Sequence, residues 1–215
     1  MDNTYQGGSL PDSVIQSQIN VLSSAYNGSG VSFRLAGVDR TINGNWFTFG
    51  GNPNSPFMNQ MKQALRRGSV QTLNVYSVGF AEESGGFLGY ATFPWDFQQN
   101  PSVDGVVFAF STTPGGSIVG LNQGKILVHE VGHWVGLLHT FEGGCAEPGD
   151  YVADTPAEAS AARGCPTNRD TCPGGGVDPI QNHMDYTDDS CRQSFTDGQV
   201  SRFKKALNQF RGTSL

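Results

Sequence analysis

Long apolar segments and charged side chains are both scarce in this sequence of 215 residues. No stretch approaches the roughly 18 consecutive apolar residues that a transmembrane helix needs, which excludes a membrane span of that kind. Only 15% of the residues are charged, whereas 29 are glycine. This composition excludes a coiled coil or a disordered chain and favours a loop-rich globular protein. Internal repeats with a period of about 20–50 residues are absent, which excludes a solenoid or a propeller.

Basic side chains are also in deficit. The sequence has 13 Lys and Arg against 19 Asp and Glu, a net charge of −6, so no nucleic-acid partner is expected. Twelve of the nineteen acidic side chains lie after residue 128. This imbalance suits a bound metal ion or a cationic ligand better than a phosphate backbone.

Cysteine is absent before residue 145, and no CxxC pair occurs among Cys145, Cys165, Cys172 and Cys191. The missing CxxC pattern argues against a structural zinc site made of cysteines. An even number of cysteines in a Gly- and Pro-rich region predicts two disulfides with three possible pairings, and disulfides persist outside the reducing cytosol. The alternative is four free thiols in a cytosolic protein.

No apolar segment follows Met1, because the residues directly after it are polar. We therefore expect no signal peptide within this sequence. We expect the chain to begin at a mature domain, with any signal or inhibitory pro-segment of a zymogen outside it.

Hydrophobic spacing predicts four helices and four strands, with one long irregular segment over 142–180 before the last helix. Ser55-Pro56 and the pair Thr196 and Gln199 have the composition of helix starts. The first helix is expected to be capped by Asp12 or Ser13 and to run to Tyr26; the others are expected from Ser55 to Leu65, over 125–138 and from Thr196 to Phe210. The strands are expected over 31–35, 73–78, 85–94 (an edge strand) and 106–110.

The segment HEVGHWVGLLH, residues 129–139, holds three of the four histidines. On a helix, His129 and His133 are one turn apart and present their rings to the same side. His139 would lie about 15 Å along a straight helix from His129, so the chain must turn before it. Gly136 is best able to adopt the positive φ of such a turn. We therefore predict a zinc ion held by His129, His133 and His139.

Three imidazoles on zinc leave a fourth position open, where bound water can reach a pKa near 7. Glu130 follows the first ligand directly and is predicted to be the general base. Three alternatives remain: buried or capping histidines without metal, a zinc site that does no chemistry, and a hydrolase that uses HExxH with a distant Glu as ligand. The carboxylate of Glu130 argues against the second, and His139 against the third.

The zinc motif, followed by Asn182-His183-Met184-Asp185-Tyr186, resembles the metzincin metalloproteases. The GDYVADTP, GCP, DPI and MDY elements are similar to the pappalysin (cytophagalysin) family, above all to its secreted fungal members. The resemblance implies that Met184 is the Met-turn residue beneath the metal and that Tyr186 helps to stabilise the oxyanion. His183 stands where the family more often has an apolar or aromatic residue, and we do not expect it to be a fourth ligand.

The same resemblance implies features away from the zinc ligands. The segment GGFLGYATF is similar to the edge strand that holds an extended substrate, which makes Gly86, Leu88, Gly89 and Tyr90 candidate substrate-binding residues, together with His183. The implied disulfides are Cys145–Cys172 and Cys165–Cys191. A structural calcium ion is also implied.

The calcium ligands implied by the resemblance are Asp150, Asp154, Thr155 and the backbone carbonyl of Val152, since calcium prefers oxygen ligands. The alternative is an acidic surface loop. Asp185, Asp188 and Asp189 near the zinc motif raise the further hypothesis of a preference for basic substrate side chains.

Together these features predict an α+β fold: one metzincin-like catalytic domain over 1–215. Its upper part, 1–139, has a twisted mixed sheet with helices above the zinc cleft, and its lower part, 140–215, is loop-rich and disulfide-bonded and ends in a helix. The predicted function is that of a secreted, extracellular, monomeric zinc endopeptidase that acts on protein or peptide substrates. The alternative is a zinc-containing peptide-binding or adhesion module without catalysis.

Overall fold

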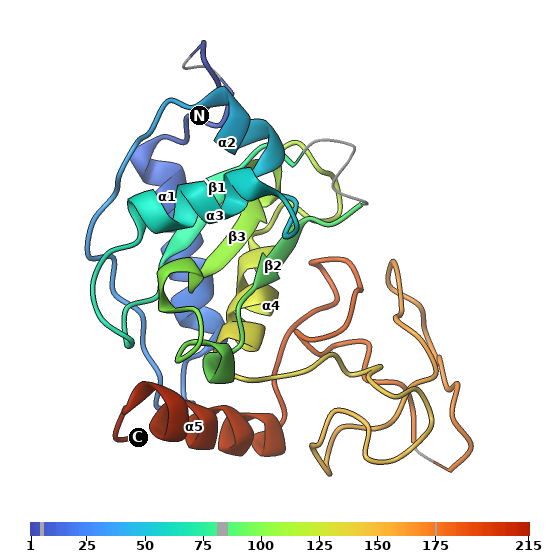
Figure 1. Ribbon diagram of the computed structural model, residues 1–215. Helices are drawn as coiled ribbons and strands as arrows, with labels where there is room; N and C mark the ends of the chain where they lie inside the picture. The colour runs from blue at the N-terminus through green and yellow to red at the C-terminus, as the bar shows by residue number, and fades with distance from the viewer. Residues whose placement is uncertain (5–6, 81–85, 175) are drawn as a thin grey trace.

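A small mixed sheet of three strands lies in the upper half of the molecule as drawn in Figure 1. The computed structural model describes residues 1–4, 7–80, 86–174 and 176–215. The strands are β1 (Val75–Val78), β2 (Gly89–Ala91) and β3 (Val106–Ala109). β3 is central, and it pairs in parallel with β1 and antiparallel with β2. β2 is therefore an antiparallel edge strand, as the sequence predicts.

Three of the four predicted strands are confirmed with shorter bounds, and the fourth is wrong. Gly85, at the start of the segment predicted over 85–94, lies outside the described residues. The segment 31–35 is not a strand. Its alternation arises because Val31 and Phe33 pack against the main core while Ser32 faces solvent. The carbonyl of Phe33 accepts a hydrogen bond from the hydroxyl of Ser23 in a neighbouring helix.

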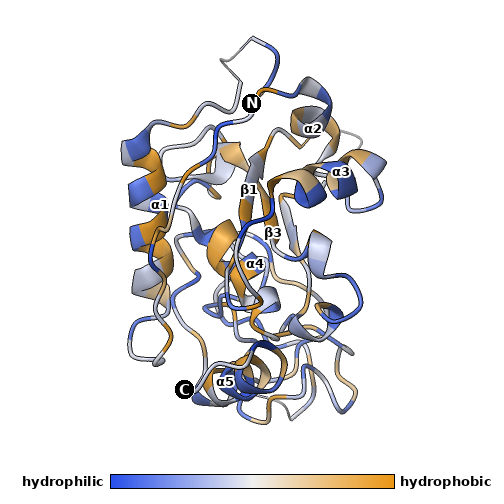
Figure 2. Ribbon diagram, turned by 60° about the vertical axis from the view of Figure 1, so that its left-hand side comes forward, coloured by the Kyte–Doolittle hydropathy of each residue, from blue (hydrophilic) through white to orange (hydrophobic). Residues whose placement is uncertain are grey.

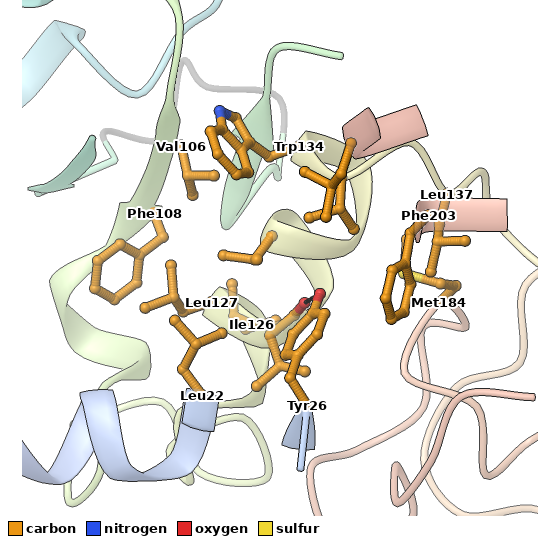
Figure 3. Close-up of a cluster of buried hydrophobic side chains, with 14 residues drawn as sticks. Leu22, Tyr26, Val106, Phe108, Ile126, Leu127, Trp134, Leu137, Met184 and Phe203 are labelled. Atoms are coloured by element: carbon orange, nitrogen blue, oxygen red, sulfur yellow. Dashed lines mark hydrogen bonds between the residues drawn. The ribbon is translucent and has the colours of Figure 1, made fainter. Parts of the chain in front are cut away.

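Helices cover both faces of the sheet. The α-helices of the described residues are α1 (Asp12–Ala25), α2 (Gly44–Phe49), α3 (Pro56–Leu65), α4 (Lys125–Trp134) and α5 (Asp197–Arg211). On one face, Val106 and Phe108 belong to the main core with residues of α1 and α4, and Figure 3 shows Leu22, Leu127 and Phe108 gathered there. On the other face, Val107 packs with Met61 of α3. β3 is buried along its whole length because both of its faces are covered.

Local capping chemistry sets where these helices begin. Ser55 caps α3 by accepting from the amide of Phe57, and Thr196 and Gln199 form a capping box at α5, so both predicted starts are confirmed. The start of α1 is not as predicted, because Pro11 is the N-cap and Asp12 is already helical. Helix α2 was not predicted from the sequence; with 6 residues it is shorter than two turns.

Short 3₁₀ helices follow the strands and their loops: η2 (Pro94–Asp96), η3 (Pro101–Val103) and η4 (Phe110–Thr112). None of the described helices is long and apolar enough to cross a membrane. Helix α4 is mostly hydrophobic in Figure 2, which accounts for its burial between α1 and the strands β2 and β3.

The segment between α4 and α5 is irregular, as the sequence predicts for 142–180. Its described residues include neither a helix nor a strand, apart from one isolated bridge between Asn182 and Ser194. Figure 1 shows it as a set of loops beside α4 and α5. Two disulfides cross it, Cys145–Cys172 and Cys165–Cys191, which are the pairs that the family resemblance implies.

A buried ion pair fastens the end of α4 to α5 and to the sheet. Both carboxylate oxygens of Asp104 lie 3.0 Å from the guanidinium of Arg211, and neither side chain is exposed. Asp104 also accepts from the indole of Trp134 at 3.2 Å and from the hydroxyl of Thr92 at 2.8 Å. The guanidinium of Arg211 lies over the Trp134 ring, 3.6 Å from its centroid.

Removal of one partner from this pair leaves a buried charge without compensation. We expect Arg211→Met to lower the free energy of unfolding by about 3–5 kcal/mol, measured by urea denaturation. The matched control is Arg67→Met at the pair Arg67–Asp39, whose side chains are each 64% exposed. There we expect a loss of at most about 1 kcal/mol. Equal losses in the two variants would contradict the importance assigned to the buried pair.

Candidate active site

Three imidazole rings converge where α4 ends. His129 and His133 lie one turn apart on this helix, and their Nε2 atoms are 3.2 Å apart. The helix ends at Trp134, four residues before the predicted end, and Gly136 has a φ of 108°. The chain reverses there and returns His139, whose Nε2 lies 3.0 Å from that of His133. The turn at Gly136 therefore has the conformation that the sequence predicts.

Hydrogen bonds fix which nitrogen each of the helical histidines offers. Nδ1 of His129 lies 2.8 Å from the carbonyl oxygen of His183, and Nδ1 of His133 lies 2.8 Å from that of Leu137. A carbonyl oxygen only accepts, so both Nδ1 atoms carry the proton and both Nε2 atoms present a lone pair. Lone pairs pointing at one another at these distances repel unless a cation lies between them. The arrangement is that of metal-binding histidines.

Burial keeps these rings neutral. Burial lowers the pKa of His133 to about 4 and that of His139 to about 3. It also lowers the pKa of His129 well below its ordinary value, and the neighbouring histidine rings lower it further. Neutral imidazoles are the form that binds zinc. The ring of His139 also stacks on Phe141, with centroids 4.6 Å apart, which holds its orientation.

Glu130 lies beside the histidines on α4 and beneath the edge strand. The side chain is only 7% exposed, and an ideal Cβ placed on Gly89 of β2 would lie 2.6 Å from its Oε1. Burial raises the pKa of Glu130 to about 8, against the opposing effect of the Arg192 guanidinium. The carboxyl group thus occupies a confined position next to the three rings.

Met184, the residue that the resemblance implies to lie beneath the metal, packs against α4 at Gly132. It is fully buried, and a Cβ placed on Gly132 would lie only 2.3 Å from its sulfur. Figure 3 shows Met184 beside Leu137 and Phe203. No role was predicted for Gly132 from the sequence, although a glycine inside a helix costs about 1 kcal/mol relative to alanine and is itself a signal of close packing.

Tyr186 directs its hydroxyl toward the three histidine rings. The oxygen lies 3.1 Å from Nε2 of His139, and the ring packs edge-on against Phe141. Burial raises the pKa of Tyr186, and the nearby Glu130 carboxylate raises it further. The phenol therefore stays protonated and can donate a hydrogen bond. The guanidinium of Arg163 lies over the outer face of the ring. Phe141 was missed by the sequence analysis, because no spacing rule links it to the motif.

His183 contributes its backbone and not its ring to the cluster. The convergent metal-ligand atoms found in the described part of the chain come from three histidines, and His183 is not among them. Its ring is buried against Phe195, 4.8 Å between centroids, and burial lowers its pKa to about 3. Its carbonyl, as noted, orients His129.

Apart from His183, the predicted substrate-binding residues lie along the edge strand or in the turn before it. Gly86 has a φ of 82° in the turn that precedes it, and the carbonyl of Leu88 accepts from Ala109 in β3. Gly89 and Tyr90 lie within β2. The hydroxyl of Tyr90 donates to the carbonyl of Gly50, so this side chain is turned to the α2 side of the sheet.

The predicted calcium ligands differ in whether their oxygen atoms already have hydrogen-bond partners. Asp150 is buried, its Oδ1 accepts from the amide of Val152, and its Oδ2 has no hydrogen-bond partner, nor has the hydroxyl of Thr155. Both carboxylate oxygens of Asp154 accept hydrogen bonds instead, from the Thr196 hydroxyl and from the amide of residue 198. Asp154 thus caps α5, a role that the sequence analysis did not foresee.

Two of the three acidic residues proposed to select basic substrates are engaged in the structure. Oδ1 of Asp185 accepts from the amides of Ala162 and Tyr186. Asp189 pairs with Arg192 at 2.7 Å and accepts from the amide of Lys125 at the start of α4. Both carboxylates accept hydrogen bonds from backbone amides, and the structure does not support an acidic substrate pocket made from them.

Comparison with known proteins agrees with this geometry. The sequence pattern described as "Pregnancy-associated plasma protein-A", a peptidase family, matches residues 68–208. An extracellular metalloprotease of Podospora anserina is 47% identical over 209 residues, which cover 95% of this chain and 69% of that protein. An extracellular metalloprotease of Pyricularia oryzae is 48% identical over 206 residues, with coverage of 95% and 70%.

Among solved structures, mature mirolysin of Tannerella forsythia in complex with a cleaved peptide superposes with a TM-score of 0.78 and 29% identity. The match covers 93% of this chain and 86% of that one. The shared fold confirms the predicted α+β, metzincin-like architecture. The chain belongs to the pregnancy-associated plasma protein-A family of metalloproteases, the pappalysins, and is a peptidase of that family.

Proposed function

We propose that the chain is a secreted zinc endopeptidase that hydrolyses internal peptide bonds. The observation that carries the proposal is the convergence of three neutral imidazoles on one point, with two Nδ1 protons already donated to backbone carbonyls. This donor set fits zinc, which favours nitrogen ligands in a tetrahedral arrangement. His129, His133 and His139 would hold the ion. When bound, zinc supplies Lewis-acid chemistry, in which the pKa of a water molecule falls and a carbonyl is polarised.

Glu130 would then act as the general base. Its carboxylate takes a proton from the attacking water, whose oxygen forms a bond to the carbonyl carbon of the substrate. The same carboxyl group later gives this proton to the nitrogen of the departing amine as the C–N bond breaks. Tyr186 would donate its phenolic hydrogen to the substrate oxygen that gains negative charge, since its hydroxyl already points at the cluster.

The free edge of β2 supports an extended peptide as the substrate. In the part of the chain that the structure describes, β2 pairs with β3 alone, so its other edge can pair with a peptide backbone above the site. Such pairing holds the backbone of the substrate irrespective of its side chains. Gly86 and Gly89 would contribute in this way, whereas the carbonyl of Leu88 already accepts from Ala109 in β3 and the Tyr90 side chain faces elsewhere.

Three further features belong to the same proposal. Secretion is supported by the two disulfides and by relatives named as extracellular metalloproteases. A structural calcium ion at Asp150, the Val152 carbonyl and Thr155 is supported by the two oxygens there that lack partners. Synthesis as a zymogen is supported by mirolysin, for which a pro-form is also known.

Glu130→Gln tests the assigned base. The amide cannot accept the water proton, so we expect the turnover rate to fall by about 10²–10⁴ while zinc stays bound. The measurements are hydrolysis of a fluorogenic peptide and metal content by mass spectrometry. Full activity in a sample of this variant free of wild-type protein would refute the mechanism.

His139→Ala tests the ligand set. We expect zinc affinity to fall by more than the roughly 10–100-fold that follows loss of a group that merely orients a ligand. His183→Phe is the matched control, because that ring lies outside the cluster, and it should retain zinc. Unchanged zinc binding by His139→Ala would instead favour a site completed by a distant Glu.

Digestion of a peptide library, with and without a chelator, tests the activity itself. We expect chelator-sensitive cuts at internal bonds of the peptides, identified by mass spectrometry, and the cut sites give the side-chain preference at the same time. Absence of cleavage by protein supplied with zinc and calcium would favour a module that binds peptides without hydrolysing them.

A further inference from the structure

The edge strand approaches the catalytic helix most closely at Gly89. A Cβ built on this residue would lie 2.6 Å from both Cγ and Oε1 of Glu130 and 2.8 Å from its Cδ. Atoms of separate side chains do not approach this closely, so Gly89 has room for a hydrogen atom and nothing more. The carboxyl group of Glu130 lies directly under the strand backbone.

No backbone requirement explains this glycine. Gly89 is paired in regular register with Phe108 of β3, so it is in neither a turn nor a bulge. Its φ lies outside the left-handed region, in contrast to that of Gly86. Glycine within a strand weakens the strand, because it has no side chain to pack and loses more conformational freedom on folding. Among the described residues, the close approach of Glu130 is the structural reason for this glycine.

The carboxyl group has little other space. Glu130 is nine-tenths buried, and α4 is itself packed against both β2 and β3. His129 occupies the adjacent position on the helix, and its ring is fixed by the carbonyl of His183. A methyl group at position 89 would therefore push the carboxyl group out of its place beside the three rings.

We propose that Gly89 is a positioning residue, whose missing side chain fixes where the Glu130 carboxyl group stands. This inference rests on the proposed function, in which Glu130 is the base. Displacement of a reacting group by about 1 Å can cost on the order of 10²-fold in rate. Gly89→Ala should therefore lower kcat by about 10–100-fold. KM should change much less, because a peptide that pairs with β2 uses its backbone, which alanine leaves intact.

A double-mutant cycle separates positioning from a general structural role. In the zinc-loaded wild-type background, Gly89→Ala should lower Tm by about 5 °C, since insertion of a methyl group into packed space is destabilising. In the Glu130→Ala background the colliding atoms are gone, so the same substitution should leave Tm unchanged or raise it. Gly37→Ala is the matched control, because a Cβ there meets nothing within 4 Å and its φ is not left-handed. It should alter neither kcat nor Tm appreciably.

The outcomes distinguish the inference from the proposed function. An equal fall of Tm in both backgrounds, or an unchanged kcat in Gly89→Ala, overturns the positioning role. If Gly89→Ala fails to fold but the double variant Gly89→Ala/Glu130→Ala folds, the collision is with Glu130 and the inference stands. If neither variant folds, the positioning role of Gly89 is refuted. An active Glu130→Gln overturns the proposed base whatever the Tm values show, since the thermal cycle needs no activity.

Discussion

Three imidazoles can point at one centre only if the chain reverses direction directly after α4. A straight helix would carry the third ring away from the first two, at 1.5 Å per residue. The positive φ of Gly136 allows the reversal, and the same turn places the carbonyl of Leu137 where it accepts the Nδ1 proton of His133. Ligand convergence and the tautomer of His133 are thus set by one backbone conformation.

Helix α4 also needs space above and below. Above it, Gly89 leaves room for the carboxyl group of Glu130; beneath it, Gly132 leaves room for the sulfur of Met184. Two elements distant in sequence therefore approach the helix at positions where a side chain is missing. Because protein interiors are packed as densely as crystals of small organic molecules, these contacts fix the position of α4 between the edge strand and the loop that contains Met184.

The sequence determines the local part of this site and leaves the distant part open. The spacing of His129, His133, Gly136 and His139 encodes geometry within eleven residues, so helix and turn could both be predicted from it. The strand predicted over 31–35 is wrong because Val31 and Phe33 pack on the core, which gives the same apolar alternation as a strand. The cap that Asp154 provides for α5 depends on a contact across more than forty residues, for which one sequence carries no signal.

The irregular segment after α4 shows how a region without helices and strands can still hold a catalytic helix in place. Asp189, at its far end, accepts from amides at the start of α4, where Gly124 offers no capping side chain. Arg192, buried beside it, supplies the compensating charge at 2.7 Å, and the disulfide at Cys191 ties this stretch to Cys165. A helix N-terminus favours negative charge, so the carboxylate stabilises the helix from outside it. The loops therefore anchor the beginning of α4, while Asp104 and Arg211 anchor its end through Trp134, and the histidines lie between two fixed points.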